Sequence, residues 1–235
     1  MDILNFAPNK FGLSNNQLKI IAIISMFLDH FGLYLFPNVI MFRILGRIAL
    51  PIFAYMIAEG CLHTKNRVKY LLHLFILGLG CQIVFFIVSN SIYQGILMTF
   101  SVSIILIYAI DYFLSKKNIL SFLIIFLTIA TVIFVAGILP TVWKKSGFDF
   151  DYGMLGIFLP VVIYYSKYKL LKLLSLSIFI IFMAIEFTTI LLYSFLALPL
   201  LFSYNNERGK CKLKYLFYIF YPVHLVFIFL LKYLI

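Results

Sequence analysis

Long apolar stretches separated by short polar connections run along this chain from about residue 18 to its end. Most are close to the roughly 20 residues that a helix needs to cross a bilayer, and none alternates like a strand of a membrane barrel. We therefore predict an all-α, polytopic membrane helix bundle of about nine transmembrane helices. The apolar segments are 18–36, 38–61, 68–88, 93–114, 119–139, 151–166, 170–184, 187–203 and 213–233.

Residues 170–203 allow two interpretations, one overlong helix or two helices joined by a turn near Glu186. The cations of the connecting loops favour two helices, because cytoplasmic loops of membrane proteins are rich in Lys and Arg. If all four basic loops are cytoplasmic, the chain crosses twice between Lys172 and Arg208, which gives nine spans and a cytoplasmic N-terminus. The cations of these loops are Lys65, Arg67, Lys69, Lys116, Lys117, Lys167, Lys169, Lys172, Arg208, Lys210, Lys212 and Lys214.

Composition agrees with a membrane protein that has no separate soluble part. Of 235 residues, 64% are hydrophobic and 11% are charged, so we predict a single transmembrane domain over 1–235. The formal charge of +11 lies mostly in the loops, which favours membrane topology over nucleic-acid binding. The three cysteines show no paired or metal-ligand spacing, so we expect no metal site.

A few ionisable residues interrupt the apolar segments, and they are candidates for chemistry because burying charge in hydrocarbon is costly. Lys19 precedes His30 by eleven residues, which is about 16 Å along a helix. With the predicted topology, His30, Arg47 and His224 come to a similar depth on three helices. Histidine titrates near neutrality and suits proton transfer.

Each of these residues also has a structural interpretation. Asp29 and His30 would cap the outer end of a short first helix, and His224 would be a satisfied core histidine. Arg43 is closer to the outer surface and is expected to reach it, whereas Arg47 is deeper and needs a partner or an anionic ligand.

Two further groups have similarly open interpretations. Asp111 is expected to pair with a loop lysine, and Glu186 to lie in an external turn. A polar cluster after the second apolar segment suits the phosphates of a nucleotide-like ligand, with a purely topological role as the alternative. This cluster consists of His63, Thr64, Lys65, Asn66 and Arg67.

Several motifs resemble those of the TraX family, and together they cover about residues 16–228. The family is named for an inner-membrane protein of conjugative plasmids that acetylates the N-terminus of the pilin subunit. It is similar to a wider superfamily of transmembrane acyltransferases, which includes proteins with an arginine, ten intervening residues and then an essential histidine. This chain has Lys19 at the position of that arginine. The motifs are Leu18-Lys19 through Asp29-His30, Gly46-Arg47-Ile48-Ala49-Leu50-Pro51-Ile52-Phe53, Glu59-Gly60, Thr64-Lys65-Asn66-Arg67 with Tyr70, Asp151-Tyr152-Gly153 and Phe217-Tyr218-Ile219-Phe220-Tyr221-Pro222-Val223-His224-Leu225.

The resemblance implies a multi-pass acetyltransferase of the bacterial inner membrane. Acetyl-CoA would enter from the cytoplasm, with its phosphates on Lys19 and the cluster at 63–67. His30 would act as general base or accept the acyl group, and Asp29 would orient it unless it faces elsewhere on the helix. Arg47 would stabilise the oxyanion or bind an acceptor carboxylate.

The acceptor implied by the family is a peptide amine at the outer face, with a glycan or lipid hydroxyl as the alternative. The residues expected to meet this acceptor are Arg43, Asp151, Tyr152 and His224.

Two other classes of function stay open. One is a proton-coupled transporter that uses His30, Arg47 and His224 as a relay, against which the absence of an internal repeat counts. The other is a non-catalytic assembly factor for a secreted peptide.

Overall fold

The computed structural model describes residues 12–209 and 214–234, and in these ranges the regular secondary structure is helical apart from two isolated β-bridges. This confirms the all-α prediction. Lys210, Cys211 and Lys212 lie outside the described residues. The elements are α1 (Asn15–Leu35), α2 (Ile40–Gly46), α3 (Ala49–His63), α4 (Arg67–Ser89), α5 (Ile96–Lys116), α6 (Ile119–Ile133), the π-helix η2 (Phe134–Ile138), α7 (Leu139–Val142), η3 (Lys144–Ser146), α8 (Gly153–Tyr165), α9 (Lys169–Glu186), η4 (Thr189–Leu196), α10 (Ala197–Phe202) and α11 (Lys214–Leu234).

Within the described ranges, five helical stretches are long and apolar enough to cross a membrane. The other predicted segments coincide with α8, α9, η4 followed by α10, and α11. The chain is therefore a protein with several membrane-compatible helices, while the count of nine spans and the cytoplasmic N-terminus stay predictions. The five stretches are Asn15–Leu35, Ile40–His63, Arg67–Ser89, Ile96–Lys116 and Ile119–Val142.

The region 170–203 forms two helices, as the loop charges indicate. α9 ends at Glu186, whose side chain is exposed, and η4 begins at Thr189. Between them Thr188 has an extended backbone, with φ −165° and ψ 140°. A single overlong helix is thereby excluded.

The chain forms two compact units, Met1–Met56 with Tyr165–Ile235, and Ile57–Tyr164. The boundary falls inside α3, and each unit is described by itself below. The single domain expected from the sequence stays a prediction.

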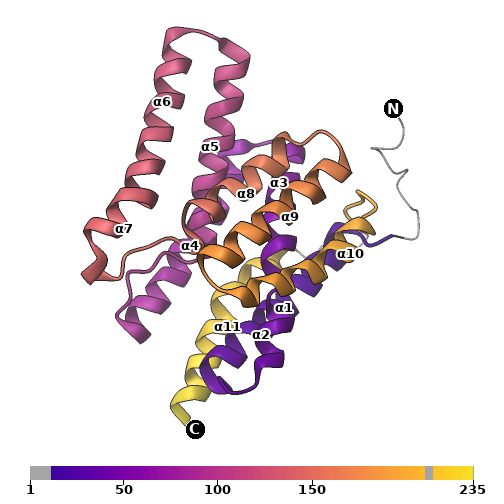
Figure 1. The fold of residues 1–235 in the computed structure, drawn as a ribbon, viewed down its shortest axis with the longest axis vertical. Coiled ribbons are helices and arrows are strands. Elements are labelled where there is room, and N and C mark those ends of the chain that lie inside the picture. Colours follow the sequence, from indigo (N-terminus) through magenta and orange to yellow (C-terminus); the bar gives the residue numbers. More distant parts are fainter. Residues whose placement is uncertain (1–11, 210–213, 235) are drawn as a thin grey trace. The chain divides into compact units, whose positions relative to one another are not determined.

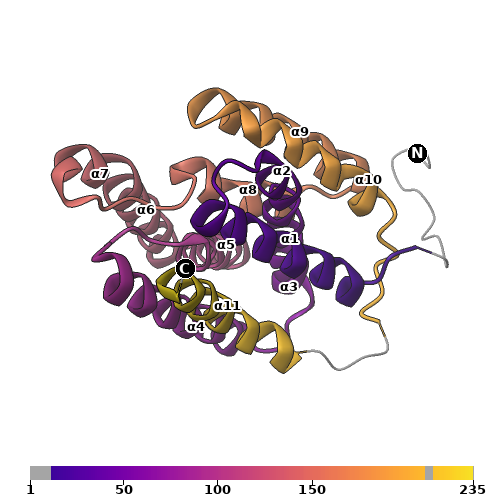
Figure 2. The same ribbon diagram turned by 90° about the horizontal axis from the view of Figure 1, so that it is seen from below.

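The first unit is built around α1, which packs on α2 and on α11 (Figure 1 and Figure 2). Ser14 and Gln17 form a capping box that starts α1 by satisfying backbone N–H groups at its first turn. On the other side of this unit, α2 contacts η4, and η4 contacts α9 and α10. α11 continues as a helix through Pro222.

A break separates α2 from α3, and the sequence explains it. Pro51 has no backbone N–H, so it cannot donate to the carbonyl of Arg47 four residues earlier. The helix is interrupted at Arg47 and Ile48, and the Ser194 hydroxyl of η4 donates to the freed Arg47 carbonyl at 3.0 Å. The proline thus accounts for the break between α2 and α3. The Arg47 carbonyl, which loses its partner within the helix, accepts a hydrogen bond from η4 instead.

The second unit contains α4 to α8, in which α5 contacts both α4 and α6. Small polar residues of α5 contact α8 and the turn before it. Ser103 donates to the Ile157 carbonyl of α8 at 2.7 Å, and Thr99 donates to the Asp151 carbonyl of the turn at 3.2 Å. Such close contacts through small residues are typical of helices packed in membranes.

Gly46 is a point of close approach between α2 and α1, and this gives a test of the packing. A Cβ at position 46 would collide with the Cβ, Oδ1 and Cα of Asp29. We expect Gly46→Ala to push the two helices apart and to cost about 1–3 kcal/mol of stability, measured as a lower unfolding midpoint in detergent.

The matched control is Gly80→Ala, because a Cβ at position 80 of α4 meets nothing within 4 Å. Equal midpoints for the two alanine variants would contradict the close contact at Gly46.

Candidate functional site

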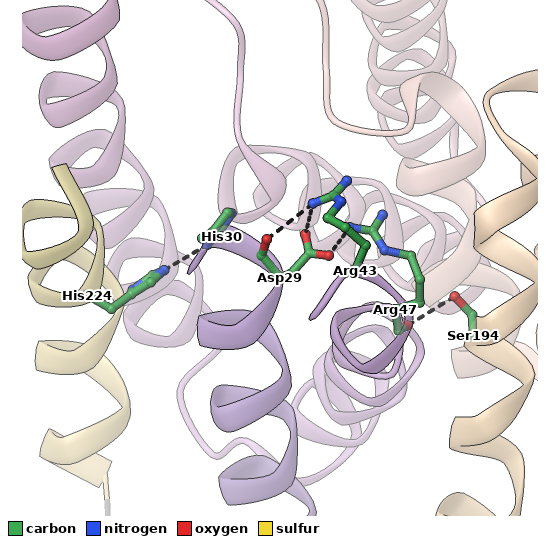
Figure 3. A network of polar contacts seen from close by, with 6 residues as sticks. All are labelled: Asp29, His30, Arg43, Arg47, Ser194 and His224. Atoms are coloured by element: carbon green, nitrogen blue, oxygen red, sulfur yellow. Dashed lines mark hydrogen bonds and ion pairs between the residues drawn. The ribbon is translucent and has the colours of Figure 1, made fainter. Parts of the chain in front are cut away.

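Asp29 lies between two arginines at the contact of α1 and α2 (Figure 3). Its Oδ2 accepts a hydrogen bond from Nη1 of Arg43 at 2.7 Å, and its Oδ1 accepts one from Nη2 of Arg47. Nη1 of Arg43 also reaches the Asp29 backbone carbonyl at 3.4 Å. Arg43 and Arg47 present their guanidiniums together because residues four apart share a helix face.

The prediction that Arg47 needs a partner is confirmed, since Asp29 supplies it. Arg43 binds the same carboxylate. Its expected extension to the outer surface stays a prediction. The side chains are 6% (Arg47), 15% (Asp29) and 21% (Arg43) exposed, which makes Arg43 the more accessible of the two arginines. Two guanidiniums share one carboxylate, so this triad carries one net positive charge.

Asp29 and His30 face different neighbours although they are consecutive. Adjacent residues of a helix point about 100° apart, so Asp29 is directed at α2 and His30 at α11. The Asp29 side chain is engaged by the arginines, whereas the His30 side chain is hydrogen-bonded to His224. Of the two alternatives left by the sequence, the structure thus selects the one in which Asp29 faces away from the imidazole.

His30 and His224 form a hydrogen-bonded pair that joins α1 to α11. Nδ1 of His30 lies 2.9 Å from Nε2 of His224, and Nδ1 of His224 lies 3.0 Å from the Phe220 carbonyl oxygen. A carbonyl only accepts, so Nδ1 of His224 carries the hydrogen, and Nε2 of neutral His224 is the acceptor. Nδ1 of His30 then donates, which leaves the lone pair of His30 on its Nε2.

Burial distinguishes the two histidines. His224 is 2% exposed, whereas His30 is partly exposed. Their rings stack with centroids 5.1 Å apart, and Phe220 and Tyr34 flank the pair at 5.2 and 6.3 Å. His30 is thus the more accessible histidine, with a lone pair on Nε2. The buried His224 holds His30 in the tautomer that carries its hydrogen on Nδ1.

A comparison with protein families matches the model of the family described as TraX protein over residues 14–232, nearly the whole chain. This chain belongs to the TraX family. The match confirms the resemblance drawn from the motifs, and both residues of the histidine pair lie inside the matched range.

Among curated proteins, this TraX chain is similar to an uncharacterized protein of Rickettsia prowazekii (strain Madrid E), 37% identical over 83 residues. It is also similar to the probable fimbrial assembly protein FimC, serogroup H1, of Dichelobacter nodosus, 39% identical over 70 residues. The aligned segments cover 33% of this chain and 33% of the first relative, and 28% and 29% for the second. No solved structure is significantly similar to this chain.

Lys19 lies on the same face of α1 as His30. Eleven residues of helix amount to three turns and about 20°, so the two side chains point nearly the same way about 16 Å apart. The helix geometry thus gives this TraX chain a cation and a histidine aligned along one helix.

The predicted cofactor cluster at 63–67 lies at the turn from α3 to α4 in the second unit. Asn66 caps α4 by accepting from the Lys69 amide at 2.8 Å, and Thr64 donates to the Asn66 carbonyl at 3.2 Å. His63 is directed at Glu59, with Nδ1 2.9 Å from its carbonyl oxygen. Lys65 is exposed. The turn therefore has a structural role for most of its polar groups, and its role in binding a cofactor stays a prediction.

Arg67, the last member of that cluster, forms an ion pair with Asp111 of α5 at 2.7 Å and lies 5.0 Å from the centre of the Tyr108 ring. Tyr164 also donates to Asp111 at 2.7 Å. The expectation that Asp111 pairs with a cation is confirmed, but the partner is Arg67 rather than a lysine.

Asp151 and Tyr152 lie in the second unit, at the turn that leads into α8. Tyr93 donates to Oδ1 of Asp151 at 3.1 Å, and the Asp151 amide donates to the Gln94 carbonyl at 2.9 Å. Tyr152 and Gly153 adopt positive φ values of 59° and 50°. Asp151 and Tyr152 thus shape a turn, and their predicted contact with the acceptor stays a prediction.

Ser194 is a member of this network that the sequence does not reveal. It is 1% exposed and belongs to the network through the Arg47 carbonyl. The only signal is a single serine in the apolar stretch 190–202, and only the fold shows that it binds the carbonyl of Arg47 at the break after α2.

The two-to-one charge ratio of the triad gives a prediction about stability. Asp29→Asn removes the carboxylate that binds the buried guanidinium of Arg47 and the partly exposed guanidinium of Arg43, and is expected to cost about 3–5 kcal/mol. Arg43→Gln leaves the Asp29–Arg47 pair intact, so the cost is smaller, about 1 kcal/mol. Unfolding midpoints in detergent compare the two.

Asp111→Asn serves as control, because its partner Arg67 is 48% exposed and is hydrated without the carboxylate. A greater loss for Arg43→Gln than for Asp29→Asn would contradict this account of the triad.

Proposed function

We propose that this chain is an acyltransferase of the bacterial inner membrane that transfers an acetyl group from acetyl-CoA to an acceptor at the outer face. The proposed acceptor is a peptide N-terminal amine, in keeping with the TraX family and with a similar protein described as a fimbrial assembly protein. The observation that carries the proposal is the His30–His224 pair at 2.9 Å, which leaves Nε2 of the more accessible histidine as a base.

The pair supports a direct transfer. Nε2 of His30 takes a proton from the acceptor nitrogen as that nitrogen bonds to the acetyl carbon. The tetrahedral intermediate then collapses, the carbon–sulfur bond breaks, and the proton on His30 passes to the sulfur, giving the acetylated acceptor and CoA thiol. His224 accepts the Nδ1 hydrogen of His30 throughout and stabilises the imidazolium.

The Asp29–arginine triad supplies the charge that such a reaction needs. The oxygen of the tetrahedral intermediate is negative, and a preorganised cation in an apolar site stabilises it strongly. Arg43 is the better candidate for this contact because its side chain is more exposed than that of Arg47. Asp29 and Arg47 then act as positioning residues that hold the Arg43 guanidinium.

The proposal is tested with the protein in nanodiscs, acetyl-CoA and a peptide with a free N-terminus, by mass spectrometry of the peptide and by CoA release. His30→Ala is expected to lower transfer by about a hundredfold to ten-thousandfold, the contribution that general base catalysis makes. The control is His73→Ala, which removes a histidine of α4 that contacts its own helix, at the Lys69 carbonyl.

Activity of His30→Ala equal to that of the wild type would overturn the proposal. Proton-driven uptake of a solute into liposomes without acetyl transfer would assign the histidine pair to a transporter.

A separate prediction concerns His224, which in this mechanism contributes to catalysis by accepting the Nδ1 hydrogen of His30 and does not touch the substrate. His224→Ala is expected to lower kcat by about a hundredfold with little change in KM, since substrate is still bound but the tautomer is no longer held. Nitrogen-15 NMR should show His224 with its hydrogen on Nδ1. A hydrogen on Nε2 of neutral His224 would contradict the hydrogen-bond assignment.

A further inference from the structure

A surface that the proposed reaction does not use lies in the second unit, where the long apolar helix through α6, η2 and α7 ends (Figure 1). The consecutive side chains of Val142, Trp143, Lys144 and Lys145 are exposed there. Val142 is 69% and Trp143 55% exposed, so this end presents apolar and aromatic surface directly beside two cations. We call these four residues the tryptophan–lysine end.

The backbone around Trp143 is held in a defined turn. The Trp143 amide donates to the Leu139 carbonyl at 2.8 Å, and the Trp143 carbonyl accepts from the amide and the hydroxyl of Ser146 at 2.8 and 2.7 Å. Gly147 then adopts a φ of 71°, the left-handed conformation in which helical segments commonly end. The indole and the two lysines therefore belong to an ordered turn at the end of the helix.

The helix before this turn is long enough to bring both of its ends to the lipid headgroups. Its 24 residues, Ile119–Val142, extend about 36 Å at 1.5 Å per residue, against about 30 Å for the hydrocarbon core of a bilayer. Only 11% of its most apolar window is buried within the protein, so most of its surface is available to lipid. Trp143 therefore lies where hydrocarbon gives way to headgroups, the depth at which tryptophan is enriched in membrane proteins.

The lysines of this end are not explained by membrane topology. A second exposed pair, Lys116 and Lys117, lies at the opposite end of the same helix, in the turn between α5 and α6. The two ends of a membrane-spanning helix lie on opposite sides of the bilayer, and only the cytoplasmic side is expected to be rich in lysine. With the predicted topology Lys116 and Lys117 are cytoplasmic, so Lys144 and Lys145 call for another role.

The charge of the tryptophan–lysine end fits an anionic headgroup. In the described part of the chain neither of its lysines forms an ion pair. The carboxylates that follow next in the sequence are bonded in the turn before α8: Oδ1 of Asp149 accepts from the Phe150 amide at 2.7 Å, and Oδ1 of Asp151 from the Tyr93 hydroxyl at 3.1 Å. Lysine binds phosphate as a point charge, and each lysine at an anionic membrane surface favours binding roughly fivefold.

We propose that the tryptophan–lysine end binds an anionic phospholipid, with its phosphate on Lys144 and Lys145, the Trp143 indole at the level of the headgroups and Val142 among the acyl chains. Such a contact anchors the end of the helix at the interface and limits its tilt. None of these residues belongs to the histidine pair or to the Asp29–arginine triad, so lipid binding here is independent of acyl transfer.

The test uses the fluorescence of the full chain in liposomes, because Trp143 is the one tryptophan of the sequence and its emission reports this site alone. The liposomes are equimolar in phosphatidylglycerol and phosphatidylcholine, and only one of the two lipids carries bromine, which quenches tryptophan on contact. The wild type is expected to be quenched more by brominated phosphatidylglycerol than by brominated phosphatidylcholine, and more by bromine near the headgroup than at the chain ends.

The lysines are tested by two double variants. Lys144→Gln with Lys145→Gln is expected to lower the preference for phosphatidylglycerol roughly fivefold per lysine, whereas Lys144→Arg with Lys145→Arg, which keeps both charges, should retain it. The matched control is Lys116→Gln with Lys117→Gln, which removes the same charge from the other end of the helix and should leave the quenching of Trp143 unchanged.

Several results would overturn the proposal. Equal quenching of the wild type by the two brominated lipids would exclude an anionic lipid site, and strongest quenching by bromine at the chain ends would place the indole in hydrocarbon. A phosphatidylglycerol preference that survives the loss of Lys144 and Lys145, or that falls equally in the control, would exclude these lysines as ligands. If polyglutamate shields Trp143 from aqueous acrylamide while the two lipids quench equally, the surface binds an acidic protein instead.

Discussion

The ion pairs of Asp29 with Arg43 and Arg47 are the interaction on which this part of the molecule depends. A carboxylate and two guanidiniums are taken out of water where α1 meets α2, and each requires the others because an unpaired charge there is very costly. The contact is close enough that Gly46 is needed opposite Asp29. The triad thereby fixes the rotation of α1, and with it the direction in which His30 points.

A single helix thus separates two kinds of chemistry. Asp29 belongs to an electrostatic network that ends at the Ser194 hydroxyl, whereas His30 belongs to a chain of hydrogen bonds that ends at the Phe220 carbonyl. Consecutive residues achieve this because a helix turns about 100° per residue. The histidine pair and the Asp29–arginine triad therefore stay separate although they start from consecutive residues of α1.

Both networks contain a polar group that is satisfied by an element distant in the sequence. Pro51 frees the carbonyl of Arg47, and Ser194 of η4 binds it. His224 of α11 fixes the hydrogen of His30. In a molecule with so much apolar surface, such contacts specify which helices meet, because apolar packing alone discriminates poorly between neighbours.

The sequence by itself determined the class of the protein, because apolar segments of spanning length are stable in a membrane only as helices. It also determined the family and singled out His30, Arg47 and His224, since an ionisable residue inside an apolar segment is costly to bury without a partner or a chemical role. Only the tertiary structure decided their partners. Hydropathy and spacing give depth along a helix but not its rotation, so the sequence allows Asp29 to orient His30, whereas in the folded molecule Asp29 binds two arginines instead.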